Sequence, residues 1–114
     1  MDVYELSADL RSGVRDVELV AALESYLGLL QRDGKIESWR VLRRKLGLGS
    51  GPEFKILIEI RDLAQLDAAF RTVSGRQDPI ESAHFGVNSL VTNFQAALYR
   101  DFPDPHRAHG EERF

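Results

Sequence analysis

The chain of 114 residues contains no cysteine. Without cysteine there is no disulfide, no thiolate nucleophile and no zinc or iron–sulfur site with cysteine ligands. The chain also has no excess of positive charge, since 15 Lys and Arg against 18 Asp and Glu give a net charge of −3. Proteins that bind nucleic acid usually carry strongly basic patches. We therefore expect no nucleic acid partner.

Long apolar runs are also missing. No window approaches the roughly 18 apolar residues that a membrane span needs, and the first residues, MDVYELSADLRSG, have no apolar stretch typical of a secretory signal. We therefore expect a cytoplasmic protein without membrane contact. Hydrophobic residues make up 43% of the chain and charged residues 29%, which is ordinary globular composition. The length suits one domain with one core.

Four segments alternate between apolar and polar residues, which is typical of half-buried strands. They are residues 2–10, 38–46, 54–61 and 92–101. The second and third are joined by GLGSGP, whose glycines and proline favour a turn. These two segments are therefore predicted to form a hairpin.

Three segments show the apolar spacing of helices. The first covers residues 17–31, with Asp16 as its expected N-cap. The second is introduced by Asp62 and the third by DPIE at residues 78–81, where Asp78 is the expected cap. The resulting order β-α-β-β-α-α-β predicts an α+β, ferredoxin-like fold: a four-stranded antiparallel sheet in the order 4-1-3-2 with helices on one face.

Residues 1–102 are expected to form this domain, and residues 103–114, rich in charge and proline, a flexible tail. Within the hairpin, pairing of Arg40 with Glu59 would place apolar side chains under the helices and charged ones on the open face. The open face would still be half apolar, through Val3, Leu42, Leu57, Ala97 and Tyr99. Such a surface favours a partner, and we predict a homodimer through the open sheet face.

Four stretches carry a resemblance to a known family: YELSADLRSGVRD, SWRVLRRKLGLG, FKILIEIRDLAQLDAAF and HFGVNSLVTNFQAALYRDFPD. Over nearly the whole chain they resemble a small uncharacterised bacterial family of the dimeric α/β-barrel superfamily. The resemblance implies a ferredoxin-like protomer, a sheet-to-sheet dimer and often a ligand cavity between sheet and helices. The superfamily includes cofactor-independent monooxygenases, muconolactone isomerases, haem-binding proteins and stress-responsive proteins. None of their catalytic signatures can be placed on this sequence.

His84 is the candidate catalytic residue because it lies on the apolar side of the third helix and can act as a base near neutral pH. Tyr4, Trp39, Arg43 and Asn88 are the candidate ligand-binding residues, with Arg43 placed to hold an oxyanion. Tyr26 is a further candidate for the same pocket. The alternative is structural: a packed histidine, aromatics that fill the core, and an asparagine that caps the backbone.

No cofactor and no metal site are expected. His106 and His109 are three positions apart, but they lie in the tail without a preformed geometry. Two functions stay open. One is a protein that binds a small, partly apolar organic molecule in a cleft, with or without cofactor-independent oxygenation or isomerisation; the other is a noncatalytic dimerisation or interaction module with a filled core. These patterns do not decide whether the protein is an enzyme.

Overall fold

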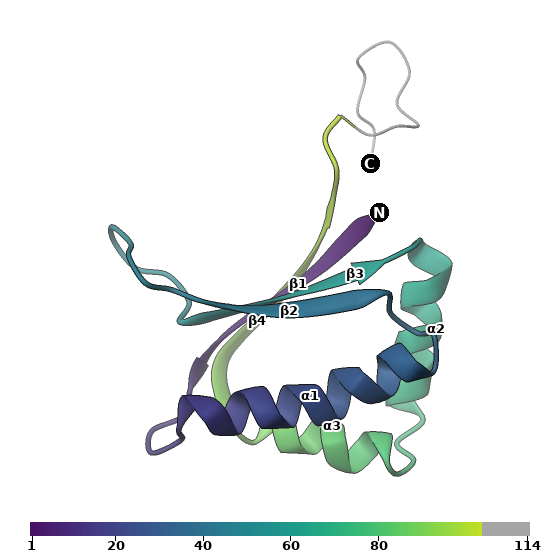
Figure 1. Cartoon of the computed structure of the whole chain (residues 1–114), viewed down its shortest axis with the longest axis horizontal. Coiled ribbons are helices and arrows are strands. Elements are labelled where there is room, and N and C mark those ends of the chain that lie inside the picture. Colours follow the sequence, from purple (N-terminus) through teal and green to yellow (C-terminus); the bar gives the residue numbers. More distant parts are fainter. Residues whose placement is uncertain (104–114) are drawn as a thin grey trace.

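The computed structural model describes residues 1–103. Its elements follow the predicted order: β1 (Asp2–Leu10), α1 (Asp16–Arg32), β2 (Ser38–Arg43), β3 (Phe54–Ile60), α2 (Leu63–Ser74), α3 (Ile80–Asn88) and β4 (Val91–Arg100). The strands form one antiparallel sheet in the order β2-β3-β1-β4. Within residues 1–103 the three helices lie on one side of this sheet, and no helix covers the other side (Figure 1). The predicted ferredoxin-like fold is confirmed.

The core lies between β3 and α1. In β3, Phe54, Ile56, Ile58 and Ile60 alternate with exposed or half-buried residues and turn their side chains toward the helices. They pack in one cluster with the buried leucines of α1, which are Leu19, Leu23, Leu27 and Leu30. Full burial of such a side chain contributes about 1.5–3 kcal/mol to folding. This cluster fixes α1 along the sheet.

The hairpin register differs by two residues from the expectation. Arg40 lies opposite Leu57, and Glu59 lies opposite Ser38, whose hydroxyl donates to the Glu59 carboxylate at 2.7 Å. Because side chains alternate with a period of two, a shift of two positions leaves every residue on its expected face. The alternation alone therefore could not choose between the two registers.

Two helix starts also differ from prediction. Asp16 is the first residue of α1 rather than its N-cap; Arg15 occupies that position, without a capping side chain. The Asp16 carboxylate instead pairs with the guanidinium of Arg43 on β2. In α3, Pro79 rather than Asp78 stands at the N-cap, and the Asp78 carboxylate accepts hydrogen bonds from both the amide and the hydroxyl of Ser82. The N-cap therefore lies one position earlier than expected in α1 and one position later in α3.

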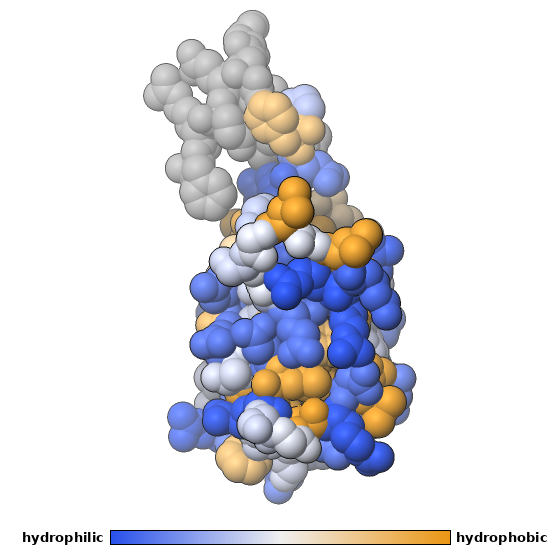
Figure 2. All heavy atoms as spheres, turned by 90° about the vertical axis from the view of Figure 1, so that its left-hand side faces the viewer, coloured by the Kyte–Doolittle hydropathy of each residue, from blue (hydrophilic) through white to orange (hydrophobic). Residues whose placement is uncertain are grey.

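Strand β2 ends at Arg43 instead of continuing to residue 46. Residues 44–53, which we call the hairpin arm, project beyond the sheet and bend away from the helices (Figure 1). Their backbone remains paired at the base, where the Arg44 amide donates to the Glu53 carbonyl at 2.9 Å. Leu46 and Leu48 on this arm are 94% and 104% exposed. Figure 2 looks at this end of the molecule and shows apolar atoms standing among polar ones.

At the opposite end of the sheet, an ion pair links β1 and β4. Arg100 of β4 donates to both carboxylate oxygens of Asp2 on β1, at 2.8 and 2.9 Å. This hydrogen bonding lowers the pKa of the buried Asp2 carboxyl, against the effect of its burial.

No helix within residues 1–103 is long and apolar enough to span a membrane. The expected flexible tail lies, beyond Pro103, outside the described residues.

Candidate functional site

A cleft of about 220 Å³ opens between the sheet and the helices. Every element except β2 contributes to its lining. The lining residues are Tyr4, Leu6, Ala8, Leu19, Leu23, Tyr26, Ile56, Phe70, Val73, His84, Val87, Asn88, Val91 and Phe94. Most are apolar, and the polar atoms come from two phenols, one imidazole and one amide. This mixture of apolar bulk and few polar groups is typical of small-molecule sites.

The polar end of the cleft is formed by α1 and α3. His84 and Asn88 are one helical turn apart, so both side chains lie on the same side of α3. The Asn88 Nδ2 atom is 3.4 Å from His84 Nε2, and the Tyr26 ring of α1 lies 5.2 Å from the imidazole, centroid to centroid. When the amide donates, Nε2 is the unprotonated nitrogen of the imidazole. These three side chains therefore form one connected polar group.

Tyr4 of β1 lines the cleft on the sheet side and contacts α2. Its ring meets Phe70 of α2 edge to face, with centroids 5.5 Å apart. Burial raises the pKa of the Tyr4 phenol. Burial also raises the pKa of Tyr26 to about 12, with a smaller contribution from Tyr4. Both phenols therefore keep their protons near neutral pH and can donate hydrogen bonds to a bound oxygen.

The described lining of the cleft contains no Asp, Glu, Lys or Arg. A charged ligand would therefore lose its hydration without gaining a counter-ion. An unpaired buried charge costs several kcal/mol. The cleft is suited to uncharged molecules.

Two of the five expected site residues lie elsewhere. Arg43 pairs with Asp16 and, at 3.8 Å, with Glu53, while its guanidinium stacks 5.5 Å from the Phe54 ring centroid. It is therefore bound at the start of α1 and is not among the residues that line the cleft. Trp39 is half-buried against the core beside β3 and also lies outside the cleft. Tyr4, His84 and Asn88 are brought together.

Two aromatic residues of the cleft were not among the expected site residues. Phe70 of α2 and Phe94 of β4 line it and remain 47% and 54% exposed. Alternation already placed Phe94 on the helix side, and helical spacing placed Phe70 on the inner side of α2. What the patterns did not show is that the helices leave β4 largely uncovered, so both rings stay accessible.

A second depression lies on the open face. We call it the open-face hollow; it has a volume of about 210 Å³ and is lined by Val3, Ser38, Trp39, Arg40, Leu57 and Glu59. Beside it, Lys55 and Glu5 form an ion pair of 3.1 Å across β3 and β1. Within residues 1–103, no group of three His, Asp or Glu residues is arranged to hold a metal ion. His106 and His109 lie outside the described residues.

Comparison with family models gives one match. The model described as "Family of unknown function (DUF6614)" matches residues 1–114, the whole chain. A search of curated protein sequences finds no match. The expected resemblance to an uncharacterised family therefore agrees with the sequence comparison.

Solved structures resemble the chain in fold. The Arabidopsis thaliana protein At3g17210 superposes with a TM-score of 0.72 at 8% identity, over 89% of this chain and 95% of that one. SnoaB, a cofactor-independent oxygenase from Streptomyces nogalater, gives 0.67 at 10% identity, over 96% and 97%. A dimeric ferredoxin-like protein of unknown function from Jannaschia sp. CCS1 gives 0.66 at 13% identity, over 89% and 100%. Identities this low establish the fold and leave the activity open.

Proposed function

The chain belongs to DUF6614, a family of unknown function, and we propose that its cleft binds a small, uncharged, flat organic molecule. The observation that carries this proposal is the composition of the cleft: apolar walls, two protonated phenols and the His84–Asn88 pair, with no charged side chain in the described lining. Its volume of about 220 Å³ lies below the ~300–1,000 Å³ of common ligand pockets, so the molecule is small.

Orientation of the ligand comes from the polar end. The phenols of Tyr4 and Tyr26 donate to an oxygen of the ligand, and its flat body lies against Phe70 and Phe94. If the ligand is a substrate, His84 accepts a proton from a carbon next to a carbonyl group. The phenols, instead of Arg43, then donate hydrogen bonds to the resulting oxyanion. Return of that proton to another carbon is an isomerisation. Reaction of the carbanion with dioxygen would be an oxygenation, the reaction class of the cofactor-independent oxygenase SnoaB.

We further propose that the protein is a homodimer through the open sheet face. Val3, Leu42, Leu57 and Tyr99 leave this face partly apolar, and Leu42 and Tyr99 are 39% and 55% exposed. The dimeric ferredoxin-like proteins of Jannaschia sp. CCS1 and Thermobifida fusca share the protomer fold. An interaction module with a filled core is the alternative function, and it predicts no accessible space at His84.

Ligand binding is tested with two probes that share a naphthalene ring and differ in charge, 2-naphthol and 2-naphthoate, by calorimetry and thermal shift near neutral pH. We expect the uncharged naphthol to bind at least about tenfold more tightly than the carboxylate, a difference of about 1.4 kcal/mol. Bound ligand raises the unfolding midpoint by mass action. The proposal fails if neither probe binds.

Two variants show whether the naphthol occupies the cleft. Val73→Phe fills the cleft from α2, so it should abolish binding, whereas Val20→Phe adds the same bulk to an α1 residue outside the lining and should leave affinity unchanged. His84→Ala should weaken binding, and Phe85→Ala, on the same helix but 68% exposed, should not. Equal affinity in Val73→Phe and Val20→Phe would place the naphthol somewhere else.

A further inference from the structure

The hairpin arm carries apolar side chains that nothing in the described chain covers. Leu46 and Leu48 are 94% and 104% exposed, on a loop that projects past the sheet. Single exposed leucines are common on protein surfaces. Two on one projecting loop, at the edge of a face that is itself half apolar, are typical of a contact site.

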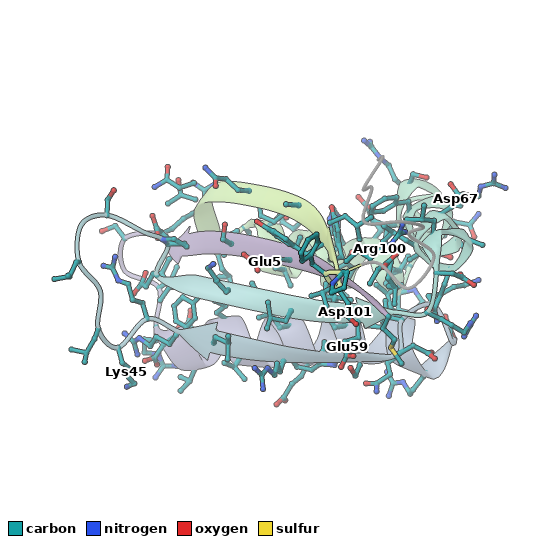
Figure 3. All side chains as sticks on the ribbon, turned by 90° about the horizontal axis from the view of Figure 1, so that it is seen from above. Glu5, Lys45, Glu59, Asp67, Arg100 and Asp101 are labelled. Carbon is teal, nitrogen blue, oxygen red and sulfur yellow. The ribbon has the colours of Figure 1, made fainter. Side chains whose placement is uncertain are left out.

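The open-face hollow has the complementary character. Val3 and Leu57 give it apolar walls, and its charged lining residues are Glu59 and Arg40. It lies toward the end of the sheet where β2 begins and β3 ends, because Ser38 pairs with Glu59 there. In the view onto the open face, Lys45 of the arm lies at one end of the sheet and Glu59 lies toward the other end (Figure 3). One chain therefore cannot place its own arm in its own hollow.

We propose that the hairpin arm of one copy docks in the open-face hollow of a second copy. Two open faces can meet about a two-fold axis that runs either along the strands or across them. An axis across the strands reverses their direction, so the arm of each copy comes over the far end of its partner's sheet, where the hollow lies. The contact is then made twice, as symmetry requires of an isologous interface. The arm bends toward the open-face side, as this arrangement needs (Figure 1).

Charge complementarity favours a second copy of this chain as the occupant. Within residues 1–103, neither Lys45 on the arm nor Glu59 at the hollow has an ion-pair partner. Docking about the axis across the strands brings the Lys45 ammonium of one copy to the Glu59 carboxylate of the other. An axis along the strands would instead place arm against arm, with Lys45 facing its own symmetry mate. Like charges would then repel.

This inference rests on the proposed homodimer and adds to it the orientation of the two copies. The absence of cysteine from the chain makes it testable with introduced thiols. We compare Leu48→Cys, Ser38→Cys and the double variant, each treated with a short bismaleimide and examined on a denaturing gel. Ser38 lies six positions before Arg44, the first residue of the arm. At about 3.3 Å per residue along a strand, Ser38 is roughly 20 Å from the base of the arm that carries Leu48. The linker therefore does not join the two thiols within one chain.

Only the double variant should give a covalent dimer, and it should give no larger species because the two contacts close on each other. A ladder of larger species would indicate a head-to-tail contact and overturn the proposal. A covalent dimer of Leu48→Cys alone would show arm against arm, which also overturns it. If light scattering shows a dimer but the double variant is not joined, the orientation is wrong and the homodimer stands. If light scattering shows a monomer, both are wrong.

A non-covalent test uses matched leucines. Leu48→Ser should weaken dimerisation about tenfold or more, because a leucine side chain leaves an apolar contact. Leu63→Ser removes a leucine of α2 that is 50% exposed on the helix side and should leave dimerisation unchanged. Equal effects of the two substitutions would contradict docking of the arm. The charge reversals Lys45→Glu and Glu59→Lys should each weaken dimerisation. The variant that carries both reversals should regain the dimer stability of the wild type.

Discussion

Burial determines the chemistry of the two phenols in the cleft. The Tyr26 ring of α1 packs against the His84 ring and is largely buried, so its ionised form would be poorly solvated and its pKa rises to about 12. Tyr4 is affected in the same direction and by the same cause. A phenol that keeps its proton is a hydrogen-bond donor at every physiological pH. The oxygen-binding end of the cleft therefore does not depend on a cation.

The raised pKa of Tyr26 predicts how stability depends on pH in the alkaline range. The folded state keeps the phenolic proton up to about pH 12, whereas the unfolded chain loses it near the ordinary value of about 10. The stabilisation is complete below pH 10 and is lost as the pH rises toward 12. Urea unfolding at stepped pH should show a steeper alkaline decline in the wild type than in Tyr26→Phe. Parallel curves for the two proteins would contradict the buried phenol.

At the residue scale, sequence patterns predict which side chains share a face but not how far each one reaches. Period-two alternation placed Tyr4 on the helix side, and helical spacing placed His84 and Asn88 one turn apart, so their meeting in the cleft was predictable. Arg43 was also predicted on the helix side correctly. Its partner was not predictable, because Asp16 is 27 positions away in the chain and approaches only after α1 has packed on the sheet.

At the scale of elements, the start of α2 is held by a buried side chain. The Gln65 side chain accepts a hydrogen bond from the Arg61 amide at 2.6 Å and donates to the Gly34 carbonyl and the Glu37 carboxylate at 3.0 and 3.1 Å. The backbone amide of Gln65 donates to the Asp62 carboxylate at 2.8 Å. Gln65 therefore ties the first turn of α2 to the loop that follows α1.

Removal of the Gln65 side chain should be costly. Gln65→Ala removes three part-buried hydrogen bonds made by a buried side chain, and we expect a loss of about 2–3 kcal/mol in the free energy of unfolding. Asp67→Ala serves as the control on the same helix, because Asp67 is exposed and makes a single ion pair with Arg71 at 2.9 Å. That substitution should cost no more than about 0.5 kcal/mol. Similar losses from the two substitutions, measured by urea unfolding, would show that Gln65 is not the tie.

Element boundaries were predictable where a local signal exists and not where tertiary contacts decide. Asp62 caps α2 as predicted, since an N-cap acts within four residues. The end of β2 at Arg43 was not predictable from alternation, which continues to residue 46. Pairing stops because the chain leaves the body of the sheet as the hairpin arm. The two-residue shift of the hairpin register has the same origin: long-range contacts such as that of Ser38 with Glu59 select it.

On the scale of the whole molecule, the proposed ligand site and the proposed partner site lie on different faces of the sheet. The described residues that line the cleft come from the helices and from the helix side of the sheet. The open-face residues Val3, Glu5, Leu57 and Glu59 turn away from the cleft. A single sheet therefore separates the proposed ligand from the proposed partner, and alternation along each strand makes this separation possible.

This separation predicts that the dimer can be broken without loss of the cleft. Leu57→Lys places a cation in the open-face hollow between Arg40 and Glu5, where the proposed contact would bring the arm of a second copy with its Lys45. We expect the wild-type unfolding midpoint to rise with protein concentration, as it does for a dimer, and that of Leu57→Lys to be independent of concentration. Light scattering should show a monomer for this variant.

The same variant should bind 2-naphthol with an affinity within about threefold of the wild type, because the effects of distant sites are independent to within about 0.5 kcal/mol, a little over a twofold change in affinity. Leu57→Thr is the control for the strand itself, since threonine removes the apolar side chain without adding charge and favours strands. If the lysine variant is folded and monomeric but no longer binds the naphthol, the second copy must complete the cleft. The helix side and the open face would then act as one site, and the two proposals would stand or fall together.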